Sequence, residues 1–296
     1  MIQLRLPALL PLLAILVSGS CIQAKSLKAV TWNLEWFPGG RPNAYEGEKV
    51  NQMNGVKAKL QKLTPDIFLA QELTEKKAFA KLVAAVPGLK VNVFSKFVEP
   101  DGKTPSPQQC GIASNLKVNS AWFESFKVTE TMPNPRRGFA FAALEHPEGG
   151  LIMLYCVHLK SNRGSETSNG EKDVANIRVE SAKQLIAHKA AMEEKFAKAK
   201  ILGWMIAGDF NTNHDGQFHR CTVIRDLVTA GFHNTWNATP KARRLTWRND
   251  PRTTDFKPTT FDYMMTSGFK ERQAKLSAAS PKLSDHNPVT LMLEVP

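Results

Sequence analysis

The chain is poor in cysteine, with four in 296 residues, at positions 21, 110, 156 and 221. So few thiols in a chain of this length exclude a small scaffold held together by disulfides. Cys156 lies inside an apolar segment with the pattern of a β-strand, so we expect it to be a buried thiol. The sequence alone fixes no pairing between the cysteines.

A long apolar run is also absent. The apolar stretch over residues 6–17 contains two prolines and is too short to span a bilayer easily. The positively charged Arg5 precedes this apolar stretch, and small residues around Ser20 and Ala24 follow it. This order of charged, apolar and small residues is typical of a secretory signal peptide. We therefore expect residues 1–24 to be removed and residues 25–296 to be exported, to a periplasmic or extracellular location.

Two other roles for the N-terminal segment remain open. An uncleaved segment would act as a membrane anchor. The sequence Ser18-Gly19-Ser20-Cys21 loosely resembles the cleavage box of bacterial lipoproteins, although the usual Leu three residues before the cysteine is missing. We expect no stable membrane partner unless Cys21 carries lipid.

The chain contains no linker, internal repeat or low-complexity tract that would mark a domain boundary. Its hydrophobic content of 42% is ample for a buried core in a chain of this size. We therefore expect residues 25–296 to form one domain and the protein to be a monomer.

Acidic residues are in deficit. The chain has 27 Asp and Glu against 39 Lys and Arg, a net charge of +12, and the signal segment contributes only Arg5 to this excess. A basic exported protein suits an anionic partner such as nucleic acid, phospholipid headgroups or lipopolysaccharide. Tuning of solubility explains the same charge, so the charge alone does not decide between partners.

Apolar periodicity predicts both helices and strands. Apolar residues recur every three or four positions over residues 48–62, which marks one face of a helix that Pro65 ends. Further helices are expected over residues 74–86, 171–200 and 221–230. The expected strands cover residues 27–32, 67–70, 91–97, 110–116, 122–128, 139–144, 151–157, 204–207, 261–266 and 289–295. Because several strands are joined as hairpins, the pattern favours mixed sheets with helices outside over a parallel doubly wound fold.

Polar side chains stand at the ends of six of these strands. Strands of one sheet, or of two packed sheets, bring their ends to a common rim, so these side chains can form one site. Acids with two histidines and two asparagines are what a Mg²⁺-dependent phosphodiester hydrolase needs. The six segments are residues 31–35, 71–72, 158–161, 208–211, 261–263 and 284–288.

Each segment also has a plain structural explanation when taken alone. Glu72 follows four apolar strand residues, and an acid there can cap the next helix. Asp209 and Asn211 point the same way in an extended backbone and can hold an oxygen nucleophile or a phosphate, but an Asx turn uses the same residues. Pro288 disfavours helix before it, so Asp285 and His286 lie on an extended loop. The coincidence of all six segments favours a catalytic site.

Taken together and in this order, the segments resemble the endonuclease/exonuclease/phosphatase superfamily, of which pancreatic-type deoxyribonuclease is a familiar member. The resemblance covers Lys28 to Val295. It implies an α/β (α+β) fold, a four-layer sandwich of two mainly antiparallel β-sheets flanked by helices. Residues 25–296 would then be the catalytic domain.

The same resemblance implies a metal centre. Glu72 would be the principal ligand of Mg²⁺ or Mn²⁺, with Asn33 and Asp285 close by. Glu35 would be a supporting acid beside these ligands.

The resemblance also implies the catalytic roles. Asp209 and Asn211 would orient the attacking water and bind the scissile phosphate. His286 would be the general base or phosphate-polarising histidine, with Asp262 as its carboxylate partner, and His158 would be the second histidine. The chain departs from the deoxyribonuclease branch in two ways, since no acidic partner for His158 and no calcium loop is recognisable in the sequence.

The expected substrate contacts are basic. Lys160 directly follows the His158 strand, and Arg136 and Arg137 precede another strand near the rim. A basic segment just before Asp262 adds further candidates, of which Arg243, Arg244 and Arg248 are expected to contact phosphate. The cations of that segment are Lys241, Arg243, Arg244, Arg248, Arg252 and Lys257.

We therefore expect an exported, Mg²⁺-dependent phosphodiesterase that hydrolyses nucleic acid, most simply an endonuclease. A sphingomyelinase-like lipid hydrolase or an inositol-phosphate hydrolase of the same superfamily is the alternative within enzymes. An exported binding protein that has lost turnover is the alternative outside enzymes, and the intact set of acids and histidines argues against it.

Overall fold

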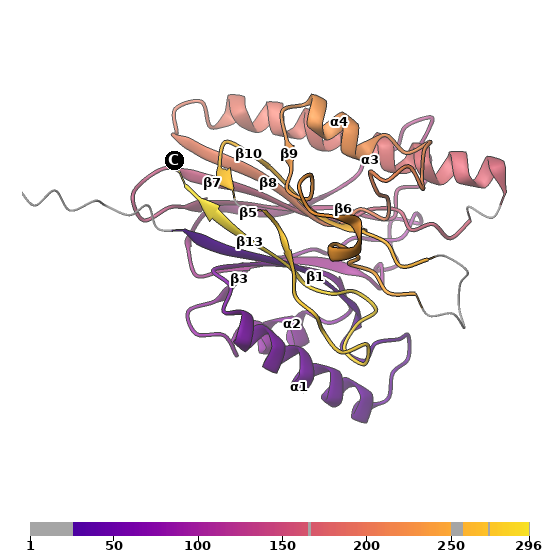
Figure 1. Ribbon diagram of the computed structural model, residues 1–296, viewed down its shortest axis with the longest axis horizontal. Coiled ribbons are helices and arrows are strands. Elements are labelled where there is room, and N and C mark those ends of the chain that lie inside the picture. Colours follow the sequence, from indigo (N-terminus) through magenta and orange to yellow (C-terminus); the bar gives the residue numbers. More distant parts are fainter. Residues whose placement is uncertain (1–25, 165–166, 250–256, 272, 296) are drawn as a thin grey trace, which may run out of the picture.

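The computed structural model describes residues 26–164, 167–249, 257–271 and 273–295 (Figure 1). The predicted signal peptide over residues 1–24, with Cys21, lies outside this part of the chain, and so does Arg252. Within the described residues, no helix combines the length and apolar character needed to cross a membrane.

One sheet gathers strands from the two ends of the described chain. It consists of β1 (Leu27–Phe37), β2 (Ile67–Leu73), β3 (Lys90–Phe94), β4 (Gln109–Ser114), β11 (Lys270–Glu271), β12 (Lys275–Leu276) and β13 (Val289–Glu294). The strand order is β11-β13-β1-β2-β4-β3, with β12 also paired to β13. Only β1 and β2 pair in parallel, and the other pairs are antiparallel.

The second sheet uses the middle of the chain. It consists of β5 (Lys117–Ser125), β6 (Gly138–Glu145), β7 (Leu151–His158), β8 (Ile201–Asp209), β9 (His233–Asn234) and β10 (Asp262–Ser267), in the order β5-β6-β7-β8-β10-β9. The parallel pair here is β7 with β8, joined by a long helical crossover. The prediction of two mainly antiparallel sheets is therefore confirmed.

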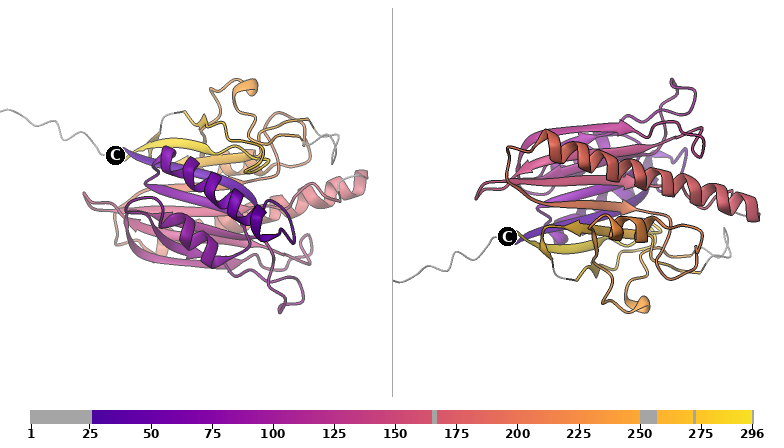
Figure 2. Two further views of the ribbon diagram at one scale, coloured as in Figure 1. Left: turned by 90° about the horizontal axis from the view of Figure 1, so that it is seen from below. Right: turned by 90° about the horizontal axis from the view of Figure 1, so that it is seen from above.

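Helices cover the outer face of each sheet (Figures 1 and 2). Helices α1 (Glu46–Leu63) and α2 (Lys76–Val83) pack on the first sheet, and α3 (Ser168–Lys195) and α4 (Val223–Thr229) pack on the second. A short 3₁₀ helix, η1 (Lys241–Arg243), lies in the basic segment. The result is the predicted order of helix, sheet, sheet and helix.

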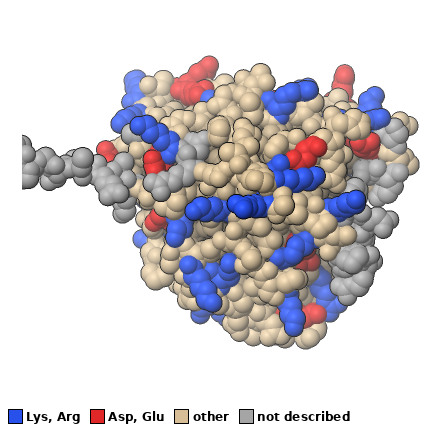
Figure 3. Space-filling model, in the orientation of Figure 1, with Lys and Arg blue, Asp and Glu red and all other residues tan. Residues whose placement is uncertain are grey.

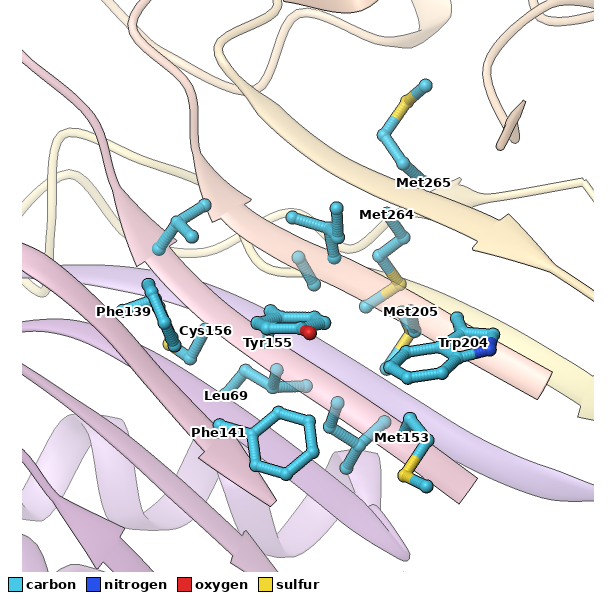
Figure 4. Close-up of a cluster of buried hydrophobic side chains, with 14 of the residues drawn as sticks. Leu69, Phe139, Phe141, Met153, Tyr155, Cys156, Trp204, Met205, Met264 and Met265 are labelled. Carbon is cyan, nitrogen blue, oxygen red and sulfur yellow. The ribbon is translucent and has the colours of Figure 1, made fainter. Parts of the chain in front are cut away.

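The main core lies between the two sheets and continues under α3 and α4. Its aromatic and sulfur-containing side chains pack from β6, β7, β8 and β10, as Figure 4 shows for Phe141, Tyr155 and Met205. A second core joins the first sheet to α1 and α2. Burial of these apolar surfaces is the main stabilising contribution to the sandwich.

Element ends differ from the sequence predictions where side chains terminate them. The strand expected over residues 91–97 covers only Lys90–Phe94, and the hydroxyl of buried Ser95 just beyond it donates to Gln109 Oε1 at 2.7 Å. The helix expected from residue 171 begins at Ser168, since the hydroxyl of Thr167 accepts a hydrogen bond from the amide of Gly170. Val50, on the predicted apolar face of α1, is 46% exposed.

Candidate active site

The predicted polar segments meet at one rim of the sandwich because of the strand directions. The parallel strands β1 and β2 end there, as do β7 and β8. Strand β10 runs antiparallel to β8, so it begins at this rim, and Asp262 lies opposite Asp209 in the register. Strand β13 runs antiparallel to β1 in the same way, which places Asp285 and His286, just before β13, beside the end of β1.

Asn33 joins the two sheets at the centre of the site. Its amide nitrogen donates hydrogen bonds to Glu72 Oε1 at 3.1 Å and to Asp209 Oδ2 at 2.9 Å. Its amide oxygen accepts from the backbone amide of Glu35 at 3.0 Å. In this arrangement Asn33 therefore presents its nitrogen, rather than its oxygen, to the two acids.

Glu72 projects into the site from a left-handed backbone position, with φ of 59°. Its Oε2 accepts hydrogen bonds from the amide of Trp36 at 3.1 Å and from Gln108 Nε2 at 2.6 Å. Burial and the negative charge of Asp285 raise the pKa of Glu72, and the hydrogen bond from Asn33 opposes that rise. A partly buried carboxylate with a raised pKa is one that a cation would stabilise in its charged form.

Glu35 and Asp285 lie side by side at the edge of the site. The backbone amide of Asp285 donates to Glu35 Oε2 at 2.8 Å, and Trp247 Nε1 donates to Asp285 Oδ2 at 2.9 Å. Burial, followed by the charge of Asp285, raises the pKa of Glu35 to about 7. The backbone of Glu35 is also left-handed, with φ of 48°.

His286 forms a buried pair with Asp262. Its Nδ1 lies 2.7 Å from Asp262 Oδ2, and its Nε2 lies 3.7 Å from Asp209 Oδ2. Burial alone would lower the pKa of His286, but the charges of Asp262, Asp285 and Asp209 outweigh it and hold that pKa well above its usual value. The amide of His286 donates to Ser284 Oγ at 2.9 Å, which fixes the backbone of this segment.

His158 is the second histidine of the site. Its Nε2 lies 3.5 Å from Asp209 Oδ2 and 3.8 Å from Glu72 Oε1. Burial, aided by the positive charge of Arg137, holds the pKa of His158 well below its usual value. Its Nδ1 is buried and has no hydrogen-bond partner among the described residues.

Asp209 and Asn211 sit on a tight turn at the end of β8. The amide of Asn211 donates to Asp209 Oδ1 at 2.9 Å, and Asn211 Nδ2 donates to Leu159 O at 3.2 Å. Gly208, with φ of 142°, precedes them, and a Cβ there would lie 2.0 Å from Val157 O. Glycine is therefore required for β7 and β8 to bring His158 and Asp209 together.

Strained backbone is concentrated at this rim. Among the described residues other than glycine, six have positive φ, and four of these belong to the site. Such conformations cost about 1–3 kcal/mol each and persist where the surrounding structure fixes them, often at functional sites. The four residues are Glu35, Trp36, Glu72 and Asn211.

Some predicted cations lie at the site and others do not. Arg137 donates to the carbonyl of Leu159 at 3.0 Å, so it stands beside the His158 strand. Lys160 Nζ donates to the carbonyls of Ser161 and Arg163, and burial followed by the charge of Arg137 lowers the pKa of Lys160 to about 8. Arg136 is exposed and lies 3.3 Å from a carboxylate oxygen of Glu99.

The basic segment divides in the same way. Arg244 is buried and forms an ion pair with Asp215 at 2.6 Å. Arg248 donates to backbone carbonyls that include Ala279 O and Ser284 O. Arg243 is exposed on η1. The described structure thus gives Arg244 and Arg248 internal partners and leaves Arg243 facing solvent.

Two residues that support the site were not identified from the sequence. Gln108 bridges Arg137 and Glu72, since it accepts from the guanidinium and donates to the carboxylate. Arg178, buried on α3, donates to Lys160 O and to Asn162 Oδ1, both at 3.0 Å. Gln108 lies in a proline-rich loop and Arg178 on a helix face, so neither carries a local signal of its position near the rim.

The site has the donor set of a hard cation. Among the described residues, no group of three or more His, Cys, Asp or Glu side chains is already arranged to hold a metal ion. The carboxylates of Glu35, Glu72 and Asp209 nevertheless crowd one rim and have raised pKa values, largely because burial penalises their charge. Carboxylate oxygens that are held together despite this penalty on their charge fit Mg²⁺ or Mn²⁺, because both cations prefer oxygen ligands.

A sequence profile of the Endonuclease/Exonuclease/phosphatase family matches residues 30–286. The chain belongs to this family. Members of the superfamily are hydrolases that act on phosphoester bonds, so the protein is assigned to that broad class of enzyme. No curated protein is significantly similar to the chain in sequence.

Solved structures show the same fold. An endonuclease/exonuclease/phosphatase from Beutenbergia cavernae superposes with a TM-score of 0.66 at 17% identity, over 91% of this chain and 72% of that one. A mannosyl-6-phosphatase from Bacteroides thetaiotaomicron gives 0.61 at 16% identity, over 90% and 99% of the two chains. TDP2 from Caenorhabditis elegans, in a truncated form, gives 0.59 at 16% identity, over 91% and 98%.

Proposed function

We propose that the protein is an exported, Mg²⁺- or Mn²⁺-dependent phosphodiesterase that cleaves nucleic acid as an endonuclease. The observation that carries the catalytic part is the continuous set of contacts from Asp262 through His286 to Asp209, and from Asp209 through Asn33 to Glu72. It brings a histidine–carboxylate pair, a second acid and the carboxylate of Glu72 together at one rim.

The residues divide the chemistry between them. Asp262 holds Nδ1 of His286, so Nε2 of His286 faces Asp209 and the space where a substrate phosphate would lie. Asp209 and Asn211 would orient the attacking water, with Asp209 accepting its proton. Neutral His158 would donate a hydrogen bond from Nε2 to a phosphate oxygen.

Glu72 would hold the metal ion, with Asp285 and Glu35 as the neighbouring oxygen donors. When bound, the cation supplies Lewis-acid stabilisation of the negative charge that builds on the phosphate. Asn33 would keep Glu72 and Asp209 at their present separation through its two hydrogen bonds.

The charge of the protein supports a polyanionic substrate. Lys and Arg side chains outnumber acidic ones in the sequence and are more prominent than acidic ones on the face shown in Figure 3. Arg136 and Arg243 are exposed, and Lys160 lies beside the His158 strand. A nucleic-acid backbone carries a charge at each nucleotide and would engage several such cations at once, whereas a single lipid headgroup or a sugar phosphate would engage few.

A substrate panel tests the activity. Purified protein with Mg²⁺ should degrade DNA or RNA much faster than it hydrolyses sphingomyelin, inositol phosphates or mannose 6-phosphate. The last substrate is included because one structural neighbour is a mannosyl-6-phosphatase. Rapid release of phosphate from a monoester with inert nucleic acid would replace the nuclease assignment by a phosphatase one.

Export rests on the pattern of residues 1–24 and has its own test. N-terminal sequencing of protein recovered from outside the cytoplasm should begin near Lys25. A lipid-modified Cys21 as first residue would show a lipoprotein instead. Recovery only from the cytoplasm with Met1 retained would exclude both versions.

A further inference from the structure

Two buried thiols face each other across the sandwich, close behind the active site. Cys110 lies on β4 of the first sheet and Cys156 on β7 of the second, and both belong to the core between the sheets. Cα atoms of β4 and β7 approach within 8 Å. Figure 4 shows Cys156 among the packed core side chains of the second sheet.

The two side chains lie near each other in the core. The neighbouring Cys156 thiol, together with burial, raises the pKa of the Cys110 thiol. Cys156 Sγ also donates to Ala70 O at 3.4 Å and accepts from Gln71 Nε2 at 3.2 Å. Ala70 pairs with Gly111, the residue after Cys110, so Cys110 and Cys156 both lie beside the same stretch of β2.

This placement suits a covalent link between the sheets. A disulfide forms without backbone movement when the two Cα atoms lie within about 7 Å and the side chains point toward each other. Antibody domains show that a disulfide can join two sheets packed face to face. Oxidising compartments outside the cytoplasm favour such bonds.

We propose that Cys110 and Cys156 form an inter-sheet disulfide under the oxidising conditions that the exported protein meets. The proposal rests on the export part of the proposed function for its setting in the cell, but not on the catalytic part. Each thiol loses one proton and one electron as the S–S bond forms. The electrons and protons pass to a disulfide oxidant, whose own S–S bond breaks to give two thiols.

The bond would form before the core closes, because the folded protein leaves Cys110 1% and Cys156 0% exposed. It would tie β7 to β4 two residues before His158. The third cysteine of the described chain, Cys221, lies elsewhere and accepts a hydrogen bond from Arg178 Nε at 3.4 Å. It is expected to stay reduced and serves as the internal control.

Refolding in a glutathione redox buffer tests the pairing without any need for export. The reduced, unfolded chain is refolded, then denatured, alkylated without reductant, digested and analysed by mass spectrometry. The expected result is a linked pair of peptides that contain Cys110 and Cys156, with Cys221 alkylated. Alkylation of both Cys110 and Cys156, or a link to Cys221, would overturn the proposal.

Thermal unfolding gives a second test. Reductant should lower the melting temperature of the oxidised wild-type protein by about 5–15 °C, since a disulfide closing a long loop stabilises the fold by constraining the unfolded chain. The Cys221→Ser variant should respond equally, and Cys156→Ala should not respond. An equal response of wild type and Cys156→Ala would contradict the proposal.

Protein isolated from cells separates the pairing from export. The linked peptides should be present in exported protein. The two experiments can also disagree, if refolding gives linked peptides while the protein from cells is cytoplasmic and retains Met1 and free thiols. That result would remove export from the proposed function and leave the pairing supported.

Discussion

His286 Nδ1 lies 2.7 Å from Asp262 Oδ2, and this contact is buried on all sides within the described structure. The carboxylate fixes the orientation of the imidazole ring, so the two side chains should act as one unit. His286→Ala and Asp262→Ala are each expected to reduce turnover by at least about 100-fold. The double variant should be little worse than the more damaging single one. Losses that add in the logarithm of the rate would show that the residues act independently.

Glu72 should be required for metal-dependent activity. Glu72→Gln keeps the size of the side chain but removes the charge that would hold the cation, and turnover should fall by at least about 100-fold. Excess chelator should abolish wild-type activity, and Mg²⁺ or Mn²⁺ should restore it. Glu75→Gln is a matched control, because Glu75 is exposed on the same segment and contacts Lys49. Full activity in chelator would exclude the metal role.

The raised pKa values of the acids predict a pH-dependent stability of the metal-free protein. The pKa of Glu35 rises on folding from 4.5 to about 7, so its protonated form stabilises the folded state at low pH. That contribution is present below pH 4.5 and is lost as the pH rises to 7, because the unfolded chain then releases the proton more readily. The pKa of Asp209, also raised to about 7, adds a loss in the same direction.

Thermal melts from pH 5 to pH 8 measure this effect. The melting temperature of wild type minus that of Glu35→Gln should fall as the pH rises, which separates Glu35 from opposing groups such as His158. Mg²⁺ should raise the wild-type melting temperature more at pH 8 than at pH 5, since the cation competes with protons for the carboxylates. Stabilisation by Mg²⁺ that is independent of pH would contradict the carboxylate site.

The exposed and internal arginines of the basic segment should behave differently. Binding of an inactive Glu72→Gln variant to DNA should weaken with salt, and a further Arg243→Ala change should flatten the logarithmic slope by about one unit if Arg243 contacts a phosphate. Lys117→Ala is the control, because exposed Lys117 lies at the opposite end of the second sheet. An unchanged slope would exclude Arg243 from the contact surface.

Arg244→Ala and Arg248→Ala should instead lower the melting temperature. Arg244 is buried against Asp215, and removal of the guanidinium would leave that carboxylate partly buried without its partner. The guanidinium of Arg248 donates hydrogen bonds to the backbone carbonyls of Ser284 and Ala279. Thermal unfolding measures both changes, and a wild-type melting temperature would show that these contacts do not stabilise the fold.

The sequence predicts what depends on local pattern and order along the chain. Strands that end in polar residues can be recognised from the sequence. The strand before Glu72 is an example, because four apolar residues precede the acid. The convergence of Asp209 and Asp262 follows from the family resemblance, since nothing local shows that β10 runs antiparallel to β8. The fold and family were predicted correctly for these reasons.

The rest depends on tertiary contacts that leave no local trace. Arg243, Arg244 and Arg248 are equivalent in sequence, and only the folded chain shows that Arg244 meets Asp215 while Arg243 faces solvent. Gln108 gains its position beside Glu72 from the path of a proline-rich loop. Exposure of individual loop cations and the polar bridges between loops therefore require the structure.

The initial rate of nucleic-acid cleavage by the purified protein tests the central claim most directly. The rate would be measured on DNA and RNA with Mg²⁺, beside sphingomyelin, inositol phosphates and mannose 6-phosphate, and with Glu72→Gln and His286→Ala as inactive controls. We predict rapid, metal-dependent cleavage of DNA or RNA that both substitutions suppress, and slow reaction with the other substrates. Inert DNA and RNA, with rapid turnover of any of the other substrates by the same site, would contradict the nuclease assignment.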